Sequence, residues 1–175
     1  MTITIPDVSL VLLVGPSGSG KSTFARKHFQ PSEVISSDYC RHLVADDESD
    51  QSATSDAFEI VHLIAAKRLA RGRLTVIDAT NIQPESRRPL LFLACRCHVS
   101  PIAIVLNLAE SACLYYNQQR PGRVVGSDVI RHQWQDMQRS LPGLEAEGFR
   151  CIYVLNSGDQ IDAAVIERRP VVSGI

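Results

Sequence analysis

The glycine-rich stretch GPSGSGKST, which begins at Gly15, directly follows the apolar run VSLVLLV. The spacing from Gly15 through Gly20 to Lys21 and Ser22 matches the G-x-x-x-x-G-K-S pattern of a phosphate-binding loop, the P-loop. Such a loop needs a buried strand before it and a helix after it, and the sequence supplies both in register. A chance glycine-rich turn would need neither. The stretch therefore predicts an α/β domain that holds the phosphates of a nucleotide.

The residues of this stretch have distinct predicted tasks. Backbone N–H groups of such a loop point at phosphate oxygens, and the start of the following helix adds partial positive charge. Lys21 reaches the β- and γ-phosphates and the Ser22 hydroxyl ligates Mg²⁺, so the predicted cofactors are ATP, or another NTP, and Mg²⁺. A side chain at Gly18 is expected to crowd the phosphates and reduce transfer without unfolding the domain. The predicted donor-binding residues are Gly15, Pro16, Ser17, Gly18, Ser19, Gly20, Lys21, Ser22 and Thr23.

Length and composition limit the other possibilities. The 175 residues suit one domain over 1–175, and 45% hydrophobic and 21% charged residues are typical of a globular protein. A net charge of −1 gives no overall basic field, so nucleic acid would bind a local patch, for which Arg41, Arg123 and Arg131 are the candidates. The apolar run near the N-terminus is too short to span a bilayer, which predicts no membrane association. The five cysteines have neither zinc-site nor disulfide spacing, so we expect reduced thiols and a cytoplasmic location.

Strand-like apolar runs alternate with helix-like runs along the chain. The predicted strands are 8–15, 33–38, 74–80, 101–108 and 149–156, and the predicted helices are 21–29, 53–72, 84–97, 110–119 and 129–141, with one short helix in the tail. Residues 44–52 are acidic and polar and are predicted to form a loop. The alternation predicts an α/β fold with a central parallel sheet of about five strands and helices on both faces. With the phosphate loop after the first strand, the resemblance described below implies that this is a P-loop kinase fold. In such sheets ligands bind beyond the carboxyl ends of the strands, where the motifs of this chain fall.

A carboxylate and an arginine follow the second predicted strand, in SSDYCR. Asp38 could accept the proton of an attacking hydroxyl, which is the role that kinases give to a positioned Asp. Arg41 is three residues further on, so on a helical turn it lies on the same side and could bind an anionic part of the acceptor. The alternative for Asp38 is an N-cap of the following helix, and one residue can serve both purposes.

Two further segments carry residues suited to phosphoryl transfer. In IDATN, Asp78 stands at the tip of the third predicted strand, where it could hold a water of the Mg²⁺ shell or orient Ser22 and Lys21. The alternative is a strand-end Asp that bonds only to the backbone. In NQQRPGR, Arg120 and Arg123 flank Pro-Gly, which predicts a mobile loop between two helices. Two guanidiniums there suit an arginine-bearing lid over the transferring phosphate, and a solvated basic loop is the alternative.

Five segments together carry a resemblance to a known family. VGPSGSGKSTFARKHF, EVISSDYCR, LTVIDATN, the R-x-x-R lid and EGFR before the last strand resemble the 5′-OH polynucleotide kinase module of bacterial polynucleotide kinase-phosphatases, which are end-healing and end-sealing RNA repair proteins. The phage polynucleotide kinase is a more distant relative. The resemblance extends from about Leu10 to about Arg169. The P-loop is common to many unrelated enzymes, whereas SSDxxR after the second strand is much more specific.

The resemblance implies NTP-dependent transfer of the γ-phosphate to the 5′-OH end of RNA or DNA. The implied catalytic residues are Asp38, Lys21, Arg120 and Arg123. Asp38 would be the general base on the 5′-OH, and the two lid arginines would bind the NTP phosphates. Arg41 would hold the acceptor strand near its terminal phosphodiester. The implied partners are therefore nucleic acid 5′-OH ends.

The resemblance also implies acceptor contacts outside the motifs. Val129 would pack against the 5′-terminal nucleobase, and Gln51 would help to hold the acceptor. Some relatives carry a further arginine one helical turn before Arg120, where this chain has Tyr116, which leaves a third lid arginine in doubt. In the family, phosphatase and ligase modules usually follow the kinase. Because the chain ends at Ile175, we expect it to be the N-terminal module of a larger repair protein, and a homodimer is left open.

Two other classes of function remain open. A small-molecule kinase, for a sugar or a nucleoside, would use the same fold with an enclosed acceptor pocket. A nucleotide-dependent switch or assembly ATPase would use a catalytic water in place of an acceptor hydroxyl. Comparison of a free nucleoside with a 3′-phosphorylated nucleotide as acceptors separates the first from a polynucleotide kinase. Rapid NTP hydrolysis that no acceptor affects would favour the second.

Overall fold

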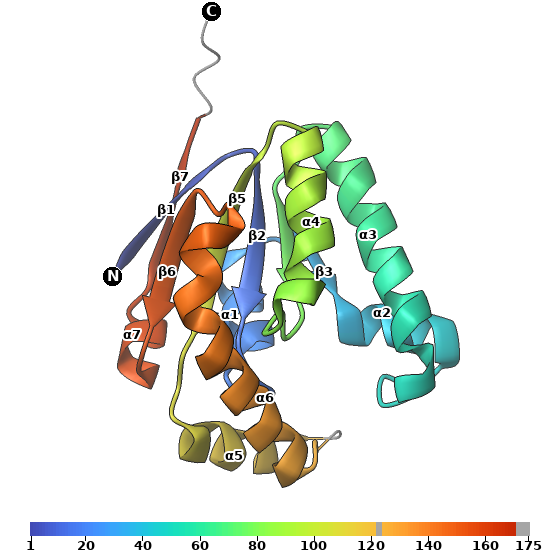
Figure 1. The fold of residues 1–175 in the computed structure, drawn as a ribbon, viewed down its shortest axis with the longest axis vertical. Helices are drawn as coiled ribbons and strands as arrows, with labels where there is room; N and C mark the ends of the chain where they lie inside the picture. Colours follow the sequence, from blue (N-terminus) through green and yellow to red (C-terminus); the bar gives the residue numbers. More distant parts are fainter. Residues whose placement is uncertain (122–123, 171–175) are drawn as a thin grey trace, which may run out of the picture.

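The centre of the fold is a five-stranded sheet (Figure 1). The computed structural model describes residues 1–121 and 124–170. The strands of the sheet are β2 (Ser9–Val14), β3 (Val34–Ser36), β4 (Thr75–Asp78), β5 (Ser100–Leu106) and β6 (Cys151–Leu155). They lie in the order β3-β4-β2-β5-β6, and every neighbouring pair is parallel. The predicted α/β P-loop kinase fold with five central strands is therefore confirmed.

Helices connect the strands and cover the sheet. They are α1 (Lys21–His28), α2 (Ser37–Ala45), α3 (Thr54–Ala70), α4 (Pro84–Arg96), α5 (Glu110–Gln118), α6 (Ser127–Ser140) and α7 (Gly158–Asp162), with the 3₁₀ helices η1 (Pro31–Glu33), η2 (Gln51–Ala53) and η3 (Leu141–Glu147). Parallel strands require such crossovers, because the chain must return to the same end of the sheet before each new strand. The five long helices predicted from the sequence are all present, and their ends lie within two residues of the predicted ends.

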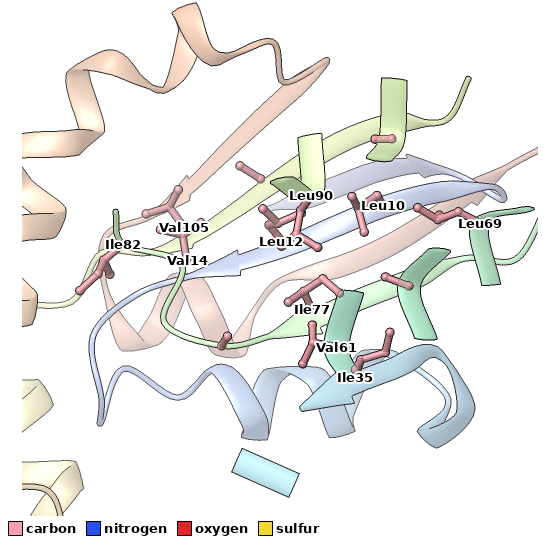
Figure 2. Packing of buried hydrophobic residues seen from close by; sticks show 14 of the residues in the cluster. Leu10, Leu12, Val14, Ile35, Val61, Leu69, Ile77, Ile82, Leu90 and Val105 are labelled. Carbon is pink, nitrogen blue, oxygen red and sulfur yellow. The ribbon is translucent and has the colours of Figure 1, made fainter. Parts of the chain in front are cut away.

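The side chains of β2 alternate between the two faces of the sheet. Leu10, Leu12 and Val14 belong to one hydrophobic cluster with residues of α3, α4 and α6. Figure 2 shows part of this cluster, with Val61 and Leu69 of α3 and Leu90 of α4 next to β2. Val11 and Leu13 belong to a second cluster, on the side of α1. All five β2 side chains in these clusters are fully buried. A strand covered on both faces needs an unbroken apolar sequence, which is why this run predicts a central parallel strand.

A second sheet, of two parallel strands, joins the two ends of the described chain and was not predicted. β1 (Thr2–Pro6) pairs with β7 (Val165–Arg169). Figure 1 shows these blue and red strands side by side. Ile3 and Ile5 of β1 are fully buried in the cluster on the α1 side. Because the two partners come from opposite ends of the sequence, no local pattern indicates their pairing.

The segment after β3 differs from the prediction in two ways. The strand ends at Ser36, so Asp38 lies in the first turn of α2. Ser36, and not Asp38, is the N-cap, because its side chain accepts a hydrogen bond from the Tyr39 N–H. The predicted loop over 44–52 is wrong at both ends, since α2 extends into its start and η2 forms near its end. α2 ends only where Asp46 takes a left-handed backbone conformation, with φ 55°.

Over residues 1–121 and 124–170, none of the helices combines the length and the hydropathy needed to cross a membrane. All five cysteines are free thiols, and Cys40 and Cys113 are buried. The buried thiols pack as small apolar side chains in two hydrophobic clusters.

Candidate active site

The glycine-rich loop leaves the carboxyl end of β2 and leads into α1. The Gly15 N–H donates to the carbonyl oxygen of Thr80 at 2.9 Å, which ties the loop to the segment after β4. Gly20 is the N-cap of α1 and has a left-handed backbone conformation, with φ 92°. α1 has no side-chain cap and no acidic residue in its first turn, so the partial positive charge of its N-terminus is left for an anion.

Gly18 holds the tip of the loop against α5. Its φ is +81°, and a Cβ added there would lie 2.1 Å from the carbonyl oxygen of Cys113 and 3.3 Å from Cβ of Asn117. A side chain at Gly18 would therefore first meet the backbone of α5, and crowding of the phosphates stays a prediction. Only glycine combines this conformation with so close an approach. The packing fixes the phosphate loop and α5 to each other.

Lys21 folds back over the loop that precedes it. Its Nζ donates to the carbonyl oxygen of Pro16 at 2.8 Å and lies 3.5 Å from Oγ of Ser19. Burial lowers the pKa of Lys21 to about 8, although the negative charges of Asp78 and Asp38 raise it. The ammonium is thus only partly compensated by protein groups, and the phosphates of a nucleotide would complete its environment.

Nucleotide binding is expected to weaken above about pH 8, because the pKa of Lys21 is lowered to about 8. Above this pH the amine of the free protein is neutral and must take up a proton to pair with phosphate, so affinity falls by up to about tenfold per pH unit. Calorimetric titration with ADP, at several pH values on either side of the pKa, measures the slope. In a Lys21→Arg variant the guanidinium stays charged, so its affinity should not vary with pH in this range. An equal slope in both proteins contradicts the assignment.

Asp78, the last residue of β4, is buried beside the start of α1. The Ser22 side chain is near enough to its carboxyl to affect the pKa of Asp78. Burial raises the pKa of Asp78, while the Lys21 ammonium and the Ser22 side chain lower it. The structure thus places Asp78 close to Ser22 and Lys21, the two residues that the sequence expected it to orient.

The oxygens of Ser22 and Asp78 fit a magnesium ion that arrives with the nucleotide. Mg²⁺ in such sites takes one or two protein oxygens and completes its shell with substrate phosphates and water. Across the described part of the chain, no group of three or more His, Cys, Asp or Glu residues could hold a metal. Phosphate oxygens and water would supply the other ligands. When bound, Mg²⁺ would neutralise negative charge on the β- and γ-phosphates.

Asp38 and Arg41 form an ion pair on the first turns of α2. Nη1 of Arg41 donates to Oδ1 of Asp38 at 2.7 Å and to the carbonyl oxygen of Glu48 at 2.9 Å. The Arg41 side chain is 6% exposed and the Asp38 side chain 37%, so the carboxylate reaches the surface and the guanidinium lies beneath it. Nε of Arg41 is buried with no hydrogen-bond partner among the described residues. The guanidinium therefore has donor capacity that these contacts do not use.

The charges of four predicted site residues act on one another. Asp38, Asp78 and Arg120 all shift the pKa of Lys21. Asp38 also raises the pKa of Asp78. Because such effects weaken with distance, the structure places these groups in one neighbourhood. They come from α1, α2, β4 and the segment after α5, which are far apart in the sequence and meet at the carboxyl end of the sheet.

The lid is described only in part. Arg120 lies two residues after the end of α5, whereas Arg123 lies outside the described residues. Asn117 of α5 is 2% exposed, and its amide joins the two sides of the lid. It accepts a hydrogen bond from the Val125 N–H at 3.1 Å and donates to the Val125 carbonyl oxygen at 2.8 Å. Asn117 was not predicted as a site residue, because an asparagine in a helix carries no sequence pattern that indicates a partner beyond the helix.

The residues predicted to contact an acceptor, or to take the place of a lid arginine, lie at the surface. Val129 is in the first turn of α6 and is 49% exposed. Gln51 is exposed at the start of η2, where its Nε2 donates to the Ser49 carbonyl oxygen at 3.2 Å. Tyr116 is 49% exposed, with its hydroxyl near Gly158. None of these positions is closed to a ligand.

A basic patch was expected from Arg41, Arg123 and Arg131. The two of these arginines that the structure describes, Arg41 and Arg131, are both paired with carboxylates. Arg131 lies 2.9 Å from a carboxylate oxygen of Asp128 and 3.5 Å from one of Glu110. Arg41 is paired as described above, and Arg123 is outside the described residues. Both described arginines thus form ion pairs with carboxylates, and the surface around Arg131 carries charges of both signs.

Comparison with protein families found one match that covers most of the chain. The model of a family described as an AAA domain matches residues 10–144, which contain the phosphate loop, both carboxylates and the lid. A search of curated protein sequences found no match.

Comparison with solved structures shows the same fold in several kinases. A chain of the Pnkp1/Rnl/Hen1 RNA repair complex has a TM-score of 0.68 at 20% identity, and the alignment covers 79% of this chain. The present chain therefore spans only about half, 47%, of the length of that chain. A gluconokinase from Sinorhizobium meliloti 1021 has a TM-score of 0.56 at 15% identity, with 90% of this chain and 87% of that chain covered. Shikimate kinase from Acinetobacter baumannii, in complex with shikimate, has a TM-score of 0.51 at 18% identity, with 89% and 88% covered.

Proposed function

Because the chain belongs to the AAA domain family and folds as a P-loop kinase, we propose that it transfers the γ-phosphate of an NTP to the 5′-hydroxyl end of RNA or DNA. The observation that carries this proposal is the pair formed by Asp38 and Arg41 beside the donor lysine. A hydroxyl acceptor needs a base, and a polynucleotide acceptor needs a cation for its phosphate. The pair supplies both chemistries within one helical turn.

In the proposed reaction the residues of the chain divide the work. Asp38 takes the proton of the 5′-hydroxyl as the hydroxyl oxygen attacks the γ-phosphorus. The bond between the γ-phosphorus and the bridging oxygen of the NDP breaks on the opposite side, in line with the attack. The products are a 5′-phosphate end and an NDP, and the proton on Asp38 passes to water. Lys21 and Arg120 stabilise charge on the transferring group, and we assign the same task to Arg123.

The acceptor contacts follow from the same assignment. Arg41 would bind the first phosphate of the acceptor strand, Val129 would pack on the terminal base, and Gln51 would hold the strand. Contacts of this kind recognise phosphate and one nucleoside, so little sequence preference is expected. We propose a kinase domain of this kind, over 1–175, for nucleic acid repair. The RNA repair complex among the similar structures supports that setting.

End labelling tests the proposal. Oligonucleotides of RNA and of DNA with a 5′-hydroxyl are incubated with γ-labelled ATP and Mg²⁺, and the same oligonucleotides with a 5′-phosphate are the control. We expect label on the 5′-hydroxyl ends. A nucleoside 3′-monophosphate should be a better acceptor than the free nucleoside by about tenfold to a hundredfold in kcat/KM, which is the size of a charge-assisted hydrogen bond. ATP hydrolysis without any label on the 5′ ends contradicts the proposal.

A small-molecule kinase is the second candidate, and one observation favours it. The gluconokinase and shikimate kinase structures align with this chain over most of their own lengths. For such an enzyme, a free sugar acid or nucleoside would be phosphorylated faster than any oligonucleotide in the same assay. It would also show no benefit from a 3′-phosphate on the acceptor.

A further inference from the structure

One peptide group of the phosphate loop is held at both of its ends. The carbonyl oxygen of Pro16 accepts a hydrogen bond from Nζ of Lys21 at 2.8 Å. The N–H of the same peptide, at Ser17, donates to Oε1 of Gln133 at 2.8 Å. The C=O and N–H of a trans peptide lie in one rigid plane and point in opposite directions. Whatever fixes the N–H therefore also fixes the carbonyl to which Lys21 is bound.

Gln133 reaches the loop from a firmly seated helix. It lies on α6, which directly follows the lid. Ile130 and Met137 of this helix are fully buried, and Nε1 of Trp134 donates to the carbonyl oxygen of Leu108 at 3.0 Å. Ser17 and Gln133 are 116 residues apart in the sequence, so their hydrogen bond is a tertiary contact and not part of a local turn.

The geometry points to Gln133 as a positioning residue of the nucleotide donor site. By holding the Ser17 N–H, its side-chain carbonyl sets the plane of the Pro16–Ser17 peptide and thereby the position of the Lys21 ammonium. α6 is in this way coupled to the residue that binds the β- and γ-phosphates. The inference rests on the donor half of the proposed function, which is nucleotide binding at the loop, and is independent of the acceptor.

Gln133→Met tests this role, because methionine has a similar length and removes the acceptor oxygen. Gln133→Glu keeps an oxygen that can accept from the Ser17 N–H. Gln135 is exposed on the same helix, two residues further on, so Gln135→Met is the matched control. The measurements are the affinity for ADP with Mg²⁺ by calorimetry, the exchange rate of the Ser17 amide by NMR, and the midpoint of urea unfolding.

We expect Gln133→Met to bind ADP about three- to tenfold more weakly, as the loss of one hydrogen bond predicts. Its Ser17 amide should exchange faster, while Gln133→Glu should keep that amide protected and Gln135→Met should match the wild type in every measurement. In steady state, KM for the NTP should rise and KM for the acceptor should not.

Three results would overturn the inference. The first is wild-type affinity for ADP in Gln133→Met. The second is a protected Ser17 amide in that variant, and the third is an equal loss of affinity in Gln135→Met. If Gln133→Met does not fold, an unprotected Ser17 amide in Gln133→Glu also overturns it. Because ADP binding involves no acceptor, an error in the proposed acceptor leaves this test intact, whereas a wild-type protein that binds no nucleotide contradicts the proposed function itself.

Discussion

Replacing Asp38 by asparagine is expected to slow transfer to a 5′-hydroxyl by about 10²- to 10⁴-fold, the usual contribution of a general base. Asparagine keeps the shape of the side chain but cannot take the proton of the attacking hydroxyl. The variant also loses the charge that pairs with Arg41 at 2.7 Å, so poorer placement of the acceptor adds to the effect. Nucleotide binding near pH 7 should be retained, because the loop residues and Lys21 are not substituted, although the pKa of Lys21 loses the contribution by which Asp38 raises it.

The matched control for this variant is Asp46→Asn. Asp46 is exposed at the other end of α2 and has a left-handed backbone conformation, which asparagine adopts readily. The same chemical change should there leave the rate of transfer unaltered. Steady-state transfer from labelled ATP to a 5′-hydroxyl oligonucleotide measures the rate, and calorimetric titration with ADP shows that the donor site is intact. Transfer at the wild-type rate by Asp38→Asn would exclude Asp38 as the base.

Replacing Arg87 by alanine is expected to lower the free energy of unfolding by about 3–5 kcal/mol, the usual cost of breaking a buried ion pair. Arg87 is fully buried on α4. Its Nε donates to Oε2 of Glu147 at 2.7 Å, its Nη2 donates to the other oxygen of that carboxylate, and its Nη1 donates to the Asn81 carbonyl oxygen at 2.8 Å. Alanine would leave a carboxylate that is only 17% exposed without its partner.

Urea unfolding measures this effect as a shift of the midpoint at constant slope. Arg88 is the neighbouring residue and is exposed, so Arg88→Ala should change stability by no more than about 0.5 kcal/mol. Arg87→Lys keeps the charge but cannot bind both carboxylate oxygens in parallel, and its stability should be intermediate. Equal stability of Arg87→Ala and the wild type would show that the ion pair contributes nothing net.

Features that depend on neighbouring residues were predicted well. The unbroken apolar run of β2 and the glycine spacing after it led to the strand, the loop and α1, because these signals are local. The spacing of three residues between Asp38 and Arg41 predicted their proximity, which the ion pair confirms. The sequence offered Asp38 as the N-cap of α2, whereas Ser36 is the N-cap in the structure. Serine and aspartate are both good N-caps, and which of them caps the helix depends on where the preceding strand ends.

Features that depend on distant partners were missed or misjudged. Arg87 has the sequence context of a surface residue of α4, yet it is fully buried. Its guanidinium donates hydrogen bonds to Glu147 and to the carbonyl oxygen of Asn81, which make this burial possible. Asn117 and Gln133 look like ordinary helix polar residues until their backbone partners are known. Each of these polar groups is buried, wholly or in part, only because a partner from another part of the chain satisfies it.

The amino-acid order alone therefore determines the class of fold, the phosphate loop and the candidate carboxylates, because strand periodicity, glycine spacing and helical spacing act over a few residues. Only the tertiary structure decides how those parts are held. It packs Gly18 on the backbone of α5, buries the Lys21 ammonium and so lowers its pKa, and joins α6 to the loop through Gln133. Burial and hydrogen-bond partnership are properties of the assembled chain, and no local pattern contains them.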